Sequence, residues 1–163
     1  MLNGKLQLRK IENERNSYFG NRCWKACGIN ASFGRAKHNV DALLEFNKYD
    51  NIEVLYDVSN MPELMSSCDI GVTSRGRTGY ELAILGIPSI SMAQNQREEK
   101  HGFVCNENGF TYIGLNPADE IIESNLKMYL SMSKESRLHF HNMLLSHDLR
   151  GGRRRVMGLI NGI

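Results

Sequence analysis

A chain of 163 residues, 41% hydrophobic and 23% charged, has the size and composition of one globular domain with a buried core. Its net charge of only +2 excludes a strongly basic nucleic-acid-binding protein. The sequence has no apolar run near the roughly 20 residues that cross a bilayer, and its first residues lack the hydrophobic segment of a secretion signal. We therefore expect a cytoplasmic protein without a membrane span.

The first part of the chain, residues 1–22, is polar and aperiodic, with weak helical character from Leu8 to Tyr18. It predicts a lead-in or interdomain linker before a single domain over residues 23–163. Within that domain, short apolar runs bounded by Gly, Pro and Asp predict strands. These strands are expected at residues 26–33, 52–56, 69–73, 88–92 and 110–113.

Between and after these strands lie segments of helical character, several with apolar residues three and four positions apart. Helices are expected at residues 38–49, 61–68, 78–85, 94–108, 121–130, 134–146 and 152–161. Strands that alternate with helices favour a Rossmann-like α/β fold, with a parallel sheet and helices on both faces. Such sheets bind ligands at the carboxyl ends of their strands. The loops after Phe33, Tyr56, Thr73 and Met92 are therefore the candidate site.

The most informative stretch is Asp69–Gln96, in which a glycine-containing turn opens a helix. The free N–H groups and the positive dipole end of a helix N-terminus suit a phosphate. Gly76 lets the backbone approach a ligand closely, and Arg75 and Arg77 can add charge-assisted hydrogen bonds. Glu81 follows one turn into the helix, where a carboxylate can accept hydrogen bonds from the diol of a ribose.

Structural alternatives accompany these interpretations. The spacing Thr78-x-x-Glu81 also fits a capping box, in which Glu81 only hydrogen-bonds the helix backbone. A metal site is not expected, because the pair Cys23 and Cys27 has no second pair of Cys or His at zinc-site spacing. The four arginines of Arg150–Arg155 favour a solvated helix end over nucleic-acid binding, since no aromatic residues are interleaved with them.

The helix-opening turn belongs to a longer pattern, G-x-T-x-x-E-x-x-x-x-G-x-P followed by N-Q, over Gly76–Gln96. This pattern resembles the C-terminal domain of GT-B glycosyltransferase-like proteins, in particular the UDP-sugar hydrolases of pseudaminic acid biosynthesis and their spore-coat polysaccharide relatives. Related domains occur fused to acylneuraminate cytidylyltransferases. The segments Ser32–Gly34, Val58–Asp69 and Asp148–Val156 resemble the same family, so the likeness covers about residues 24–160.

The resemblance implies a role for each matching residue in binding a UDP-sugar, and it implies no cofactor. The implied contacts are Ser74, Gly76, Arg77, Thr78 and Gly34 for the diphosphate, Glu81 for the ribose, Met61, Leu64 and Met65 for the uracil, and Asn95 and Gln96 for the sugar. For Met61 and Met65 the alternative is core packing of a short helix. For Gln96 the alternative is a solvated helix start.

Three departures from the family pattern stand out. The first glycine loop, Gly34–Lys37, lacks the second glycine and the aspartate of the family. The helix expected at 38–49 runs almost directly into the next strand, so the sheet is expected to be one strand–helix unit short. Arg75 and Arg77 stand where the family has small residues. These departures leave open a degenerate domain that no longer binds nucleotide.

The expected function is that of a UDP-sugar-binding domain in a glycosyltransferase-like or UDP-sugar hydrolase enzyme of surface polysaccharide or nonulosonic acid biosynthesis. Its expected partners are UDP or a UDP-sugar, and either an N-terminal GT-B domain, in cis or in trans, or a cytidylyltransferase. The alternative is a non-catalytic, degenerate binding or interaction module associated with an acylneuraminate cytidylyltransferase. The catalytic base is not identified, and His101 is only a remote candidate.

Overall fold

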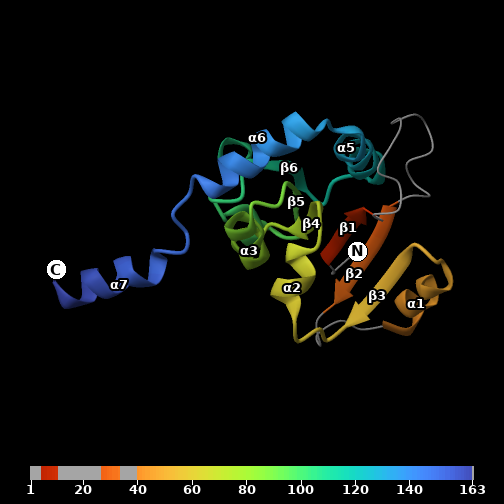
Figure 1. The fold of residues 1–163 in the computed structure, drawn as a ribbon, viewed down its shortest axis with the longest axis horizontal. Coiled ribbons are helices and arrows are strands. Elements are labelled where there is room, and N and C mark those ends of the chain that lie inside the picture. Colours follow the sequence, from red (N-terminus) through yellow and green to blue (C-terminus); the bar gives the residue numbers. More distant parts are fainter. Residues whose placement is uncertain (1–4, 11–26, 34–39, 163) are drawn as a thin grey trace.

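The computed structural model describes residues 5–10, 27–33 and 40–162, which form one mixed six-stranded sheet with helices on both faces (Figure 1). The strands are β1 (Lys5–Lys10), β2 (Cys27–Phe33), β3 (Ile52–Tyr56), β4 (Ile70–Ser74), β5 (Ser89–Ala93) and β6 (Phe110–Leu115). Their order in the sheet is β3-β2-β1-β4-β5-β6. The expected Rossmann-like α/β architecture is confirmed.

Short helices lie between the strands from β2 onward, and three longer helices follow β6. The α-helices are α1 (Val40–Leu44), α2 (Met61–Ser66), α3 (Arg77–Leu85), α4 (Gln96–Glu99), α5 (Asp119–Ser131), α6 (Lys134–Leu145) and α7 (Gly152–Asn161), and the 3-10 helices are η2 (Glu45–Lys48) and η3 (Asn106–Asn108). As expected, η2 leads almost directly into β3, which pairs in parallel with β2. None of these helices is both long and apolar enough to cross a bilayer.

Strand β1 lies in the middle of the sheet and runs antiparallel to both of its neighbours, β2 and β4. The expectation of a lead-in, with weak helical character from Leu8 onwards, is therefore wrong for these six residues. The remaining residues of the expected lead-in lie outside the described residues. The other pairs, β2 with β3, β4 with β5 and β5 with β6, are parallel. All strands except β1 thus point the same way, and their carboxyl ends share one edge.

The two faces of the sheet are covered differently. On one face, Ile70, Val72 and Ile90 pack against Tyr129 and Leu130 of α5. On the other face lies α3, whose Leu82 would touch a Cβ atom added at Gly71. This second face also carries the clusters Met65, Leu82 and Ile87, and Ala83, Val104, Phe110 and Leu144. Helix α3, which follows β4, therefore packs on one side against the sheet and on the other against α6.

The expected helix over residues 94–108 is wrong in its middle. The structure has only α4 and η3 there, separated by residues 100–105. A contact distant in sequence explains the break, because the side chain of Arg75 binds the carbonyl oxygens of Glu99 and Val104. These carbonyls point at Arg75 instead of at amides further along a helix.

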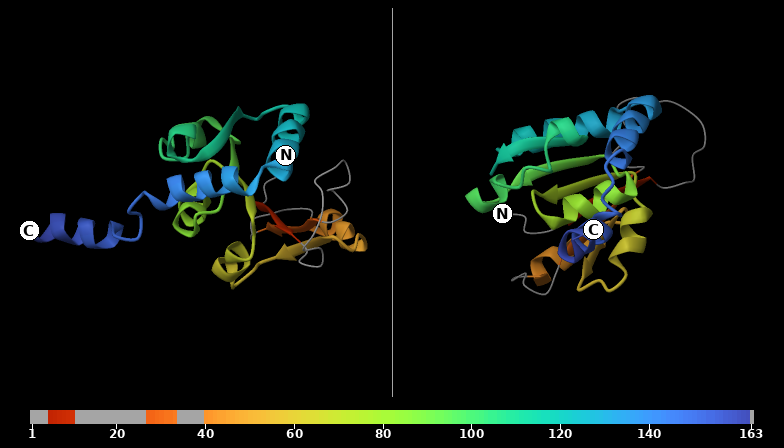
Figure 2. Two further views of the ribbon diagram at one scale, coloured as in Figure 1. Left: turned by 45° about the horizontal axis from the view of Figure 1, so that its top comes forward. Right: turned by 90° about the vertical axis from the view of Figure 1, so that its left-hand side faces the viewer.

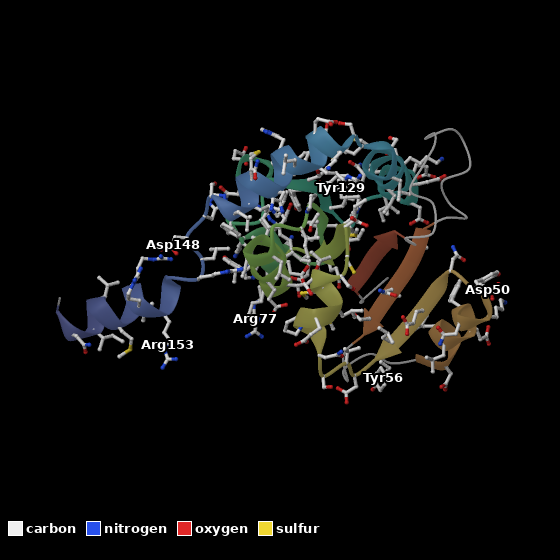
Figure 3. All side chains as sticks on the ribbon, in the orientation of Figure 1. Asp50, Tyr56, Arg77, Tyr129, Asp148 and Arg153 are labelled. Carbon is white, nitrogen blue, oxygen red and sulfur yellow. The ribbon has the colours of Figure 1, made fainter. Side chains whose placement is uncertain are left out.

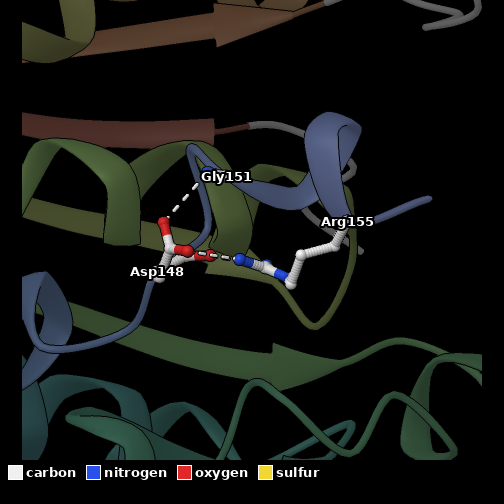
Figure 4. Close-up of polar contacts among 3 residues, drawn as sticks. All are labelled: Asp148, Gly151 and Arg155. Carbon is white, nitrogen blue, oxygen red and sulfur yellow. Dashed lines mark hydrogen bonds and ion pairs between the residues drawn. The ribbon is translucent and has the colours of Figure 1, made fainter. Parts of the chain in front are cut away.

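The last helix, α7, projects away from the body of the protein (Figures 1 and 2). It begins at a turn held by Asp148, whose carboxylate accepts hydrogen bonds from the Gly151 amide at 3.0 Å and from the Arg155 guanidinium (Figure 4). Arg155 also donates to the Asp148 carbonyl oxygen at 2.6 Å. No residue of α7 is buried, and Leu159 is 83% exposed.

Candidate functional site

The start of α3 is the centre of the candidate site. Strand β4 ends at Ser74, and Gly76 is the N-cap of α3, with extended backbone (φ −137°, ψ −160°) and no side-chain cap hydrogen bond. The first amides of a helix have no acceptor within the helix. Together with the positive end of the helix dipole they form a place where an oxyanion can bind, at the shared carboxyl edge of the strands.

The capping-box interpretation of Thr78 and Glu81 is wrong. Because the helix begins at Arg77 with Gly76 as its N-cap, Thr78 is the second helical residue and cannot act as the cap. Glu81 lies on the exposed side of α3, one turn beyond the helix start. Its carboxylate thus lies one turn from the place where an oxyanion can bind.

Arg75 has a structural role that the sequence did not indicate. Its Nε donates to the Val104 carbonyl at 2.8 Å and its Nη1 to the Glu99 carbonyl at 3.0 Å. Its guanidinium also lies 4.0 Å from the centre of the Tyr112 ring, a cation–π contact. Arg75 therefore ties the loop before α3 to β6 and to the loop after α4. Among the described residues, the other cationic side chain at the helix start is Arg77, which is exposed (Figure 3).

The residues expected at the uracil lie on α2, beside α3. Met65 is only 1% exposed and packs against Leu82 and Ile87, so core packing, the alternative interpretation, is correct for this side chain. Met61 and Leu64 are half-buried, and the Met61 sulfur lies 3.8 Å from the Ser32 hydroxyl at the end of β2. These two side chains remain available at the edge of the site.

The residues expected at the sugar follow β5. Asn95 is the N-cap of α4, and its side-chain oxygen accepts a hydrogen bond from the Glu98 amide at 3.0 Å. The Glu98 carboxylate in turn accepts from the Gln94 amide at 2.9 Å. Asn95 thus has a capping role that its expected sugar contact did not include. Gln96 is the first residue of α4 and is exposed, which agrees with the alternative interpretation of a solvated helix start.

The structure brings most of the expected site residues to one edge of the sheet. The turn after β4 and the loop after β5 are neighbours, because the Arg75 amide donates to the Met92 carbonyl at 2.8 Å. The residues gathered there are Ser74, Gly76, Arg77, Thr78, Glu81, Asn95 and Gln96. Gly34, the remaining expected diphosphate contact, lies outside the described residues.

Sequence reasoning missed a polar layer on the face of the sheet beneath α3. Five buried polar residues are present in the described part of the chain, namely Asn30, Ser32, Thr73, Ser89 and Ser91. Thr73 pairs with Ser91 and Gly71 with Ser89 in neighbouring parallel strands. The alternation of Ser89, Ile90 and Ser91 in a buried strand was the available signal, because one face of that strand must then be polar.

Within residues 40–162 and the described parts of β1 and β2, no three His, Cys, Asp or Glu side chains gather as metal ligands. His101, the remote candidate for a catalytic base, is half-buried in the loop after α4, and its amide donates to the Glu98 carbonyl. Among the described residues, this edge therefore offers amides, hydroxyls, Arg77 and Glu81, which are groups that can bind an anion and hydroxyl groups.

Comparisons with known proteins give little information about the function of this edge. No family model matches the chain. The chain is similar to the uncharacterized protein MJ1062 of Methanocaldococcus jannaschii, with 36% identity over 58 residues. That stretch is 36% of this chain and 12% of the archaeal protein, so the chain spans only a small part of its relative.

Proposed function

We propose that this domain binds the nucleotide diphosphate of a UDP-sugar, as one half of a glycosyltransferase-like or UDP-sugar hydrolase enzyme of surface polysaccharide or nonulosonic acid biosynthesis in the cytoplasm. The observation that carries the proposal is the start of α3, with its glycine N-cap and no side-chain cap hydrogen bond, at the carboxyl edge of the sheet. A diphosphate placed there accepts hydrogen bonds from the first amides of α3 and from Arg77.

The rest of the nucleotide is placed by the residues around that start. Glu81 accepts hydrogen bonds from the ribose hydroxyls, since it lies on the exposed side of α3 one turn from the diphosphate. The uracil lies toward Met61 and Leu64 on the neighbouring α2. The sugar extends over the loop after β5, toward Gln96. Asn95 reaches the sugar only if it leaves the Glu98 amide that it caps.

Turnover requires a further component. The proposed site binds phosphate and ribose equally in the ground state and the transition state, and such binding does not speed the chemical step. An acid or base must lie within hydrogen-bond reach of the oxygen atom that attacks or leaves the anomeric carbon. We propose that a second domain supplies this group: an N-terminal GT-B domain in cis or in trans, or a cytidylyltransferase partner.

The rival proposal is a non-catalytic, degenerate module. Two observations favour it: Asn95 is engaged in capping α4, and Met65 is buried in the core, so neither side chain is held ready for ligand. The two proposals differ in one measurable property. A functional nucleotide site prefers UDP over other nucleotides, whereas a degenerate module does not.

Binding of UDP is expected to shift the backbone amide signals of Gly76–Glu81 in a heteronuclear NMR titration. The effect arises because phosphate oxygens accept hydrogen bonds from the Arg77 and Thr78 amides at the start of α3, which changes the surroundings of the neighbouring amides as well. The affinity is expected to fall as salt is raised from low to physiological concentration, since charge-assisted contacts at an exposed site are screened. CDP and ADP serve as controls and are expected to bind more weakly. If millimolar UDP shifts none of these amides, the assignment is wrong.

Replacing Glu81 with alanine is expected to weaken UDP binding by about 1.5–3 kcal/mol, the range for hydrogen bonds to a charged group. The free energy of unfolding is expected to change by about 1 kcal/mol or less, because contacts of an exposed carboxylate contribute little to stability. Calorimetric titration and urea unfolding of one variant measure both quantities. Glu120→Ala removes the same charge from an exposed position on α5 and is expected to leave affinity unchanged. A variant that loses stability but not affinity refutes the ribose role.

A further inference from the structure

Helix α7 presents an apolar face that lies exposed in the described structure. The helix projects from the body of the protein, and none of its residues is buried (Figures 1 and 2). The apolar face consists of four large side chains, namely Val156 (55% exposed), Met157 (48%), Leu159 (83%) and Ile160 (71%). Single exposed apolar residues are ordinary on a protein surface, but a contiguous patch of them marks a place of interaction.

Arginines border the apolar face on both sides. Because successive residues lie about 100° apart around an α-helix, the four apolar side chains fall within an arc of about 160°. Arg154 lies about 60° beyond one end of this arc and Arg155 about 40° beyond the other. Arg153 lies within the arc, but in the first turn of the helix, and its side chain points away from Asp148 (Figure 3). Helix α7 is therefore amphipathic, with a basic polar side.

The charge around the apolar face is positive. Residues 149–163 contain four arginines and no Asp or Glu. The ion pair with Asp148 balances Arg155, and both Arg153 and Arg154 are exposed. A surface that matches this helix must therefore combine an apolar layer with negative charge beside it.

We propose that α7 binds the surface of an anionic lipid bilayer. The helix lies in the plane of the interface, with its apolar face among the acyl chains and with Arg153 and Arg154 at the lipid phosphates. Basic amphipathic helices bind membranes in this orientation, and arginine side chains are long enough to reach the headgroups from it. The binding is peripheral, because ten residues are too few to span a bilayer.

Two features of α7 favour a bilayer over a protein surface. Stable protein–protein interfaces use about 20–30 residues of each partner, whereas α7 offers ten. If two copies paired through α7, the arginines of one copy would find no carboxylate in residues 149–163 of the other. A bilayer needs no preformed groove, and its anionic lipids attract each arginine near the surface.

The test is co-sedimentation of the full chain with lipid vesicles. Vesicles of phosphatidylcholine are compared with vesicles of an equal mixture of phosphatidylcholine and phosphatidylglycerol. The chain is expected to bind the mixed vesicles roughly tenfold or more tightly, because the exposed arginines gain from the negative surface. Raising the salt concentration is expected to weaken this binding, since salt screens the attraction.

The apolar face is tested by the double variant Leu159→Ser, Ile160→Ser. This variant is expected to bind the mixed vesicles roughly tenfold or more weakly than the unchanged chain, because it loses the two most exposed apolar side chains of α7. The matched control is Leu138→Ser on α6, which removes an apolar side chain that is 52% exposed. The control is expected to bind within about twofold of the unchanged chain.

The arginines are tested by the double variant Arg153→Gln, Arg154→Gln. Its affinity for the mixed vesicles is expected to fall roughly tenfold or more, and its weaker affinity for the neutral vesicles is expected to stay unchanged. The matched control is Lys48→Gln, Lys134→Gln, which removes the same charge from exposed positions outside α7. It is expected to bind within about twofold of the unchanged chain. Urea unfolding of every variant confirms that the sheet is folded.

Three results would overturn the proposal: no binding to the mixed vesicles, equal binding to both kinds of vesicle, or binding that the α7 variants leave unchanged. Sedimentation velocity without lipid tests the other occupant. A dimer that is lost in Leu159→Ser, Ile160→Ser, while binding to vesicles persists, would assign the apolar face to a second copy and overturn the proposal. The inference does not depend on the proposed nucleotide site, and UDP titration tests that site separately.

Discussion

Replacing Gly86 with alanine is expected to lower the free energy of unfolding by about 2–4 kcal/mol. Gly86 ends α3 in the left-handed conformation (φ 68°, ψ 31°). An added Cβ atom would lie 2.5 Å from Nδ1 of His141, which donates a hydrogen bond to the Gly86 carbonyl at 2.7 Å. The substitution therefore strains the backbone and displaces the side chain that ties α3 to α6.

Alanine substitutions at two other glycines distinguish the two causes of that loss, namely backbone strain and the clash with His141. Gly102 has no atom within 4 Å of its Cβ position, and Gly102→Ala is expected to change stability by about 0.5 kcal/mol or less. Gly114 is equally open but has a φ of +101°, so Gly114→Ala carries the backbone strain without a clash. Urea unfolding of the three variants gives the comparison. Equal losses at Gly86 and Gly114 would show that the contact with His141 contributes nothing.

Raising the pH from 10 to 12 is expected to destabilise the fold through Tyr129 by about 2 kcal/mol. Burial raises the pKa of Tyr129 to about 12, and the hydrogen bond with Thr111 opposes this only in part. In the unfolded chain the phenol titrates near pH 10, about where free tyrosine does. Between these two values the folded state holds a proton that the unfolded state has released, so stability falls as the pH rises.

The matched control is Tyr129→Phe. Near neutral pH it is expected to cost about 1 kcal/mol, because the hydroxyl lies 2.8 Å from the Thr111 hydroxyl and donates to the Ser89 carbonyl at 3.2 Å. Above pH 10 the difference between the two proteins is expected to shrink and then reverse, since the phenol at position 129 is the one titrating group in which they differ. Urea unfolding of both proteins from pH 8 to 11.5 measures this difference. Curves that stay parallel across that range would contradict a buried, protonated Tyr129.

Local patterns in the sequence were enough to predict most of the fold. The strand Ile52–Tyr56 has the expected bounds, and α3 begins one residue earlier than expected. Both are delimited by residues that act locally, such as the glycine that ends α3 in a left-handed turn. Strand β1 was missed, although Leu6 and Leu8 alternate with polar residues. Its place in the sheet depends on pairing with β2 and β4, which lie far away in the sequence.

The position of the candidate site was predictable from the sequence, but the contacts made by several of its side chains were not. The turn before α3 and the exposed Glu81 follow from the order strand, glycine, helix. The role of Arg75 depends on carbonyls 24 and 29 residues away, which no local pattern contains. The pairing of Thr73 with Ser91 likewise depends on strand register. The exposed residues of the candidate site were therefore predictable, whereas the residues that pack or hydrogen-bond beneath them were not.

Because α7 projects from the body of the protein, we expect it to unfold separately from the rest of the domain. A helix of ten residues is marginal on its own in water. This one has no buried residue, so its folding relies on the turn held by Asp148 and little else in the described chain. Local unfolding of such a segment takes far less free energy than global unfolding. Its backbone amides will exchange with solvent when α7 unfolds locally, while the sheet stays folded. A partner surface that covers Leu159 and Ile160 will therefore stabilise α7 before it changes the stability of the sheet.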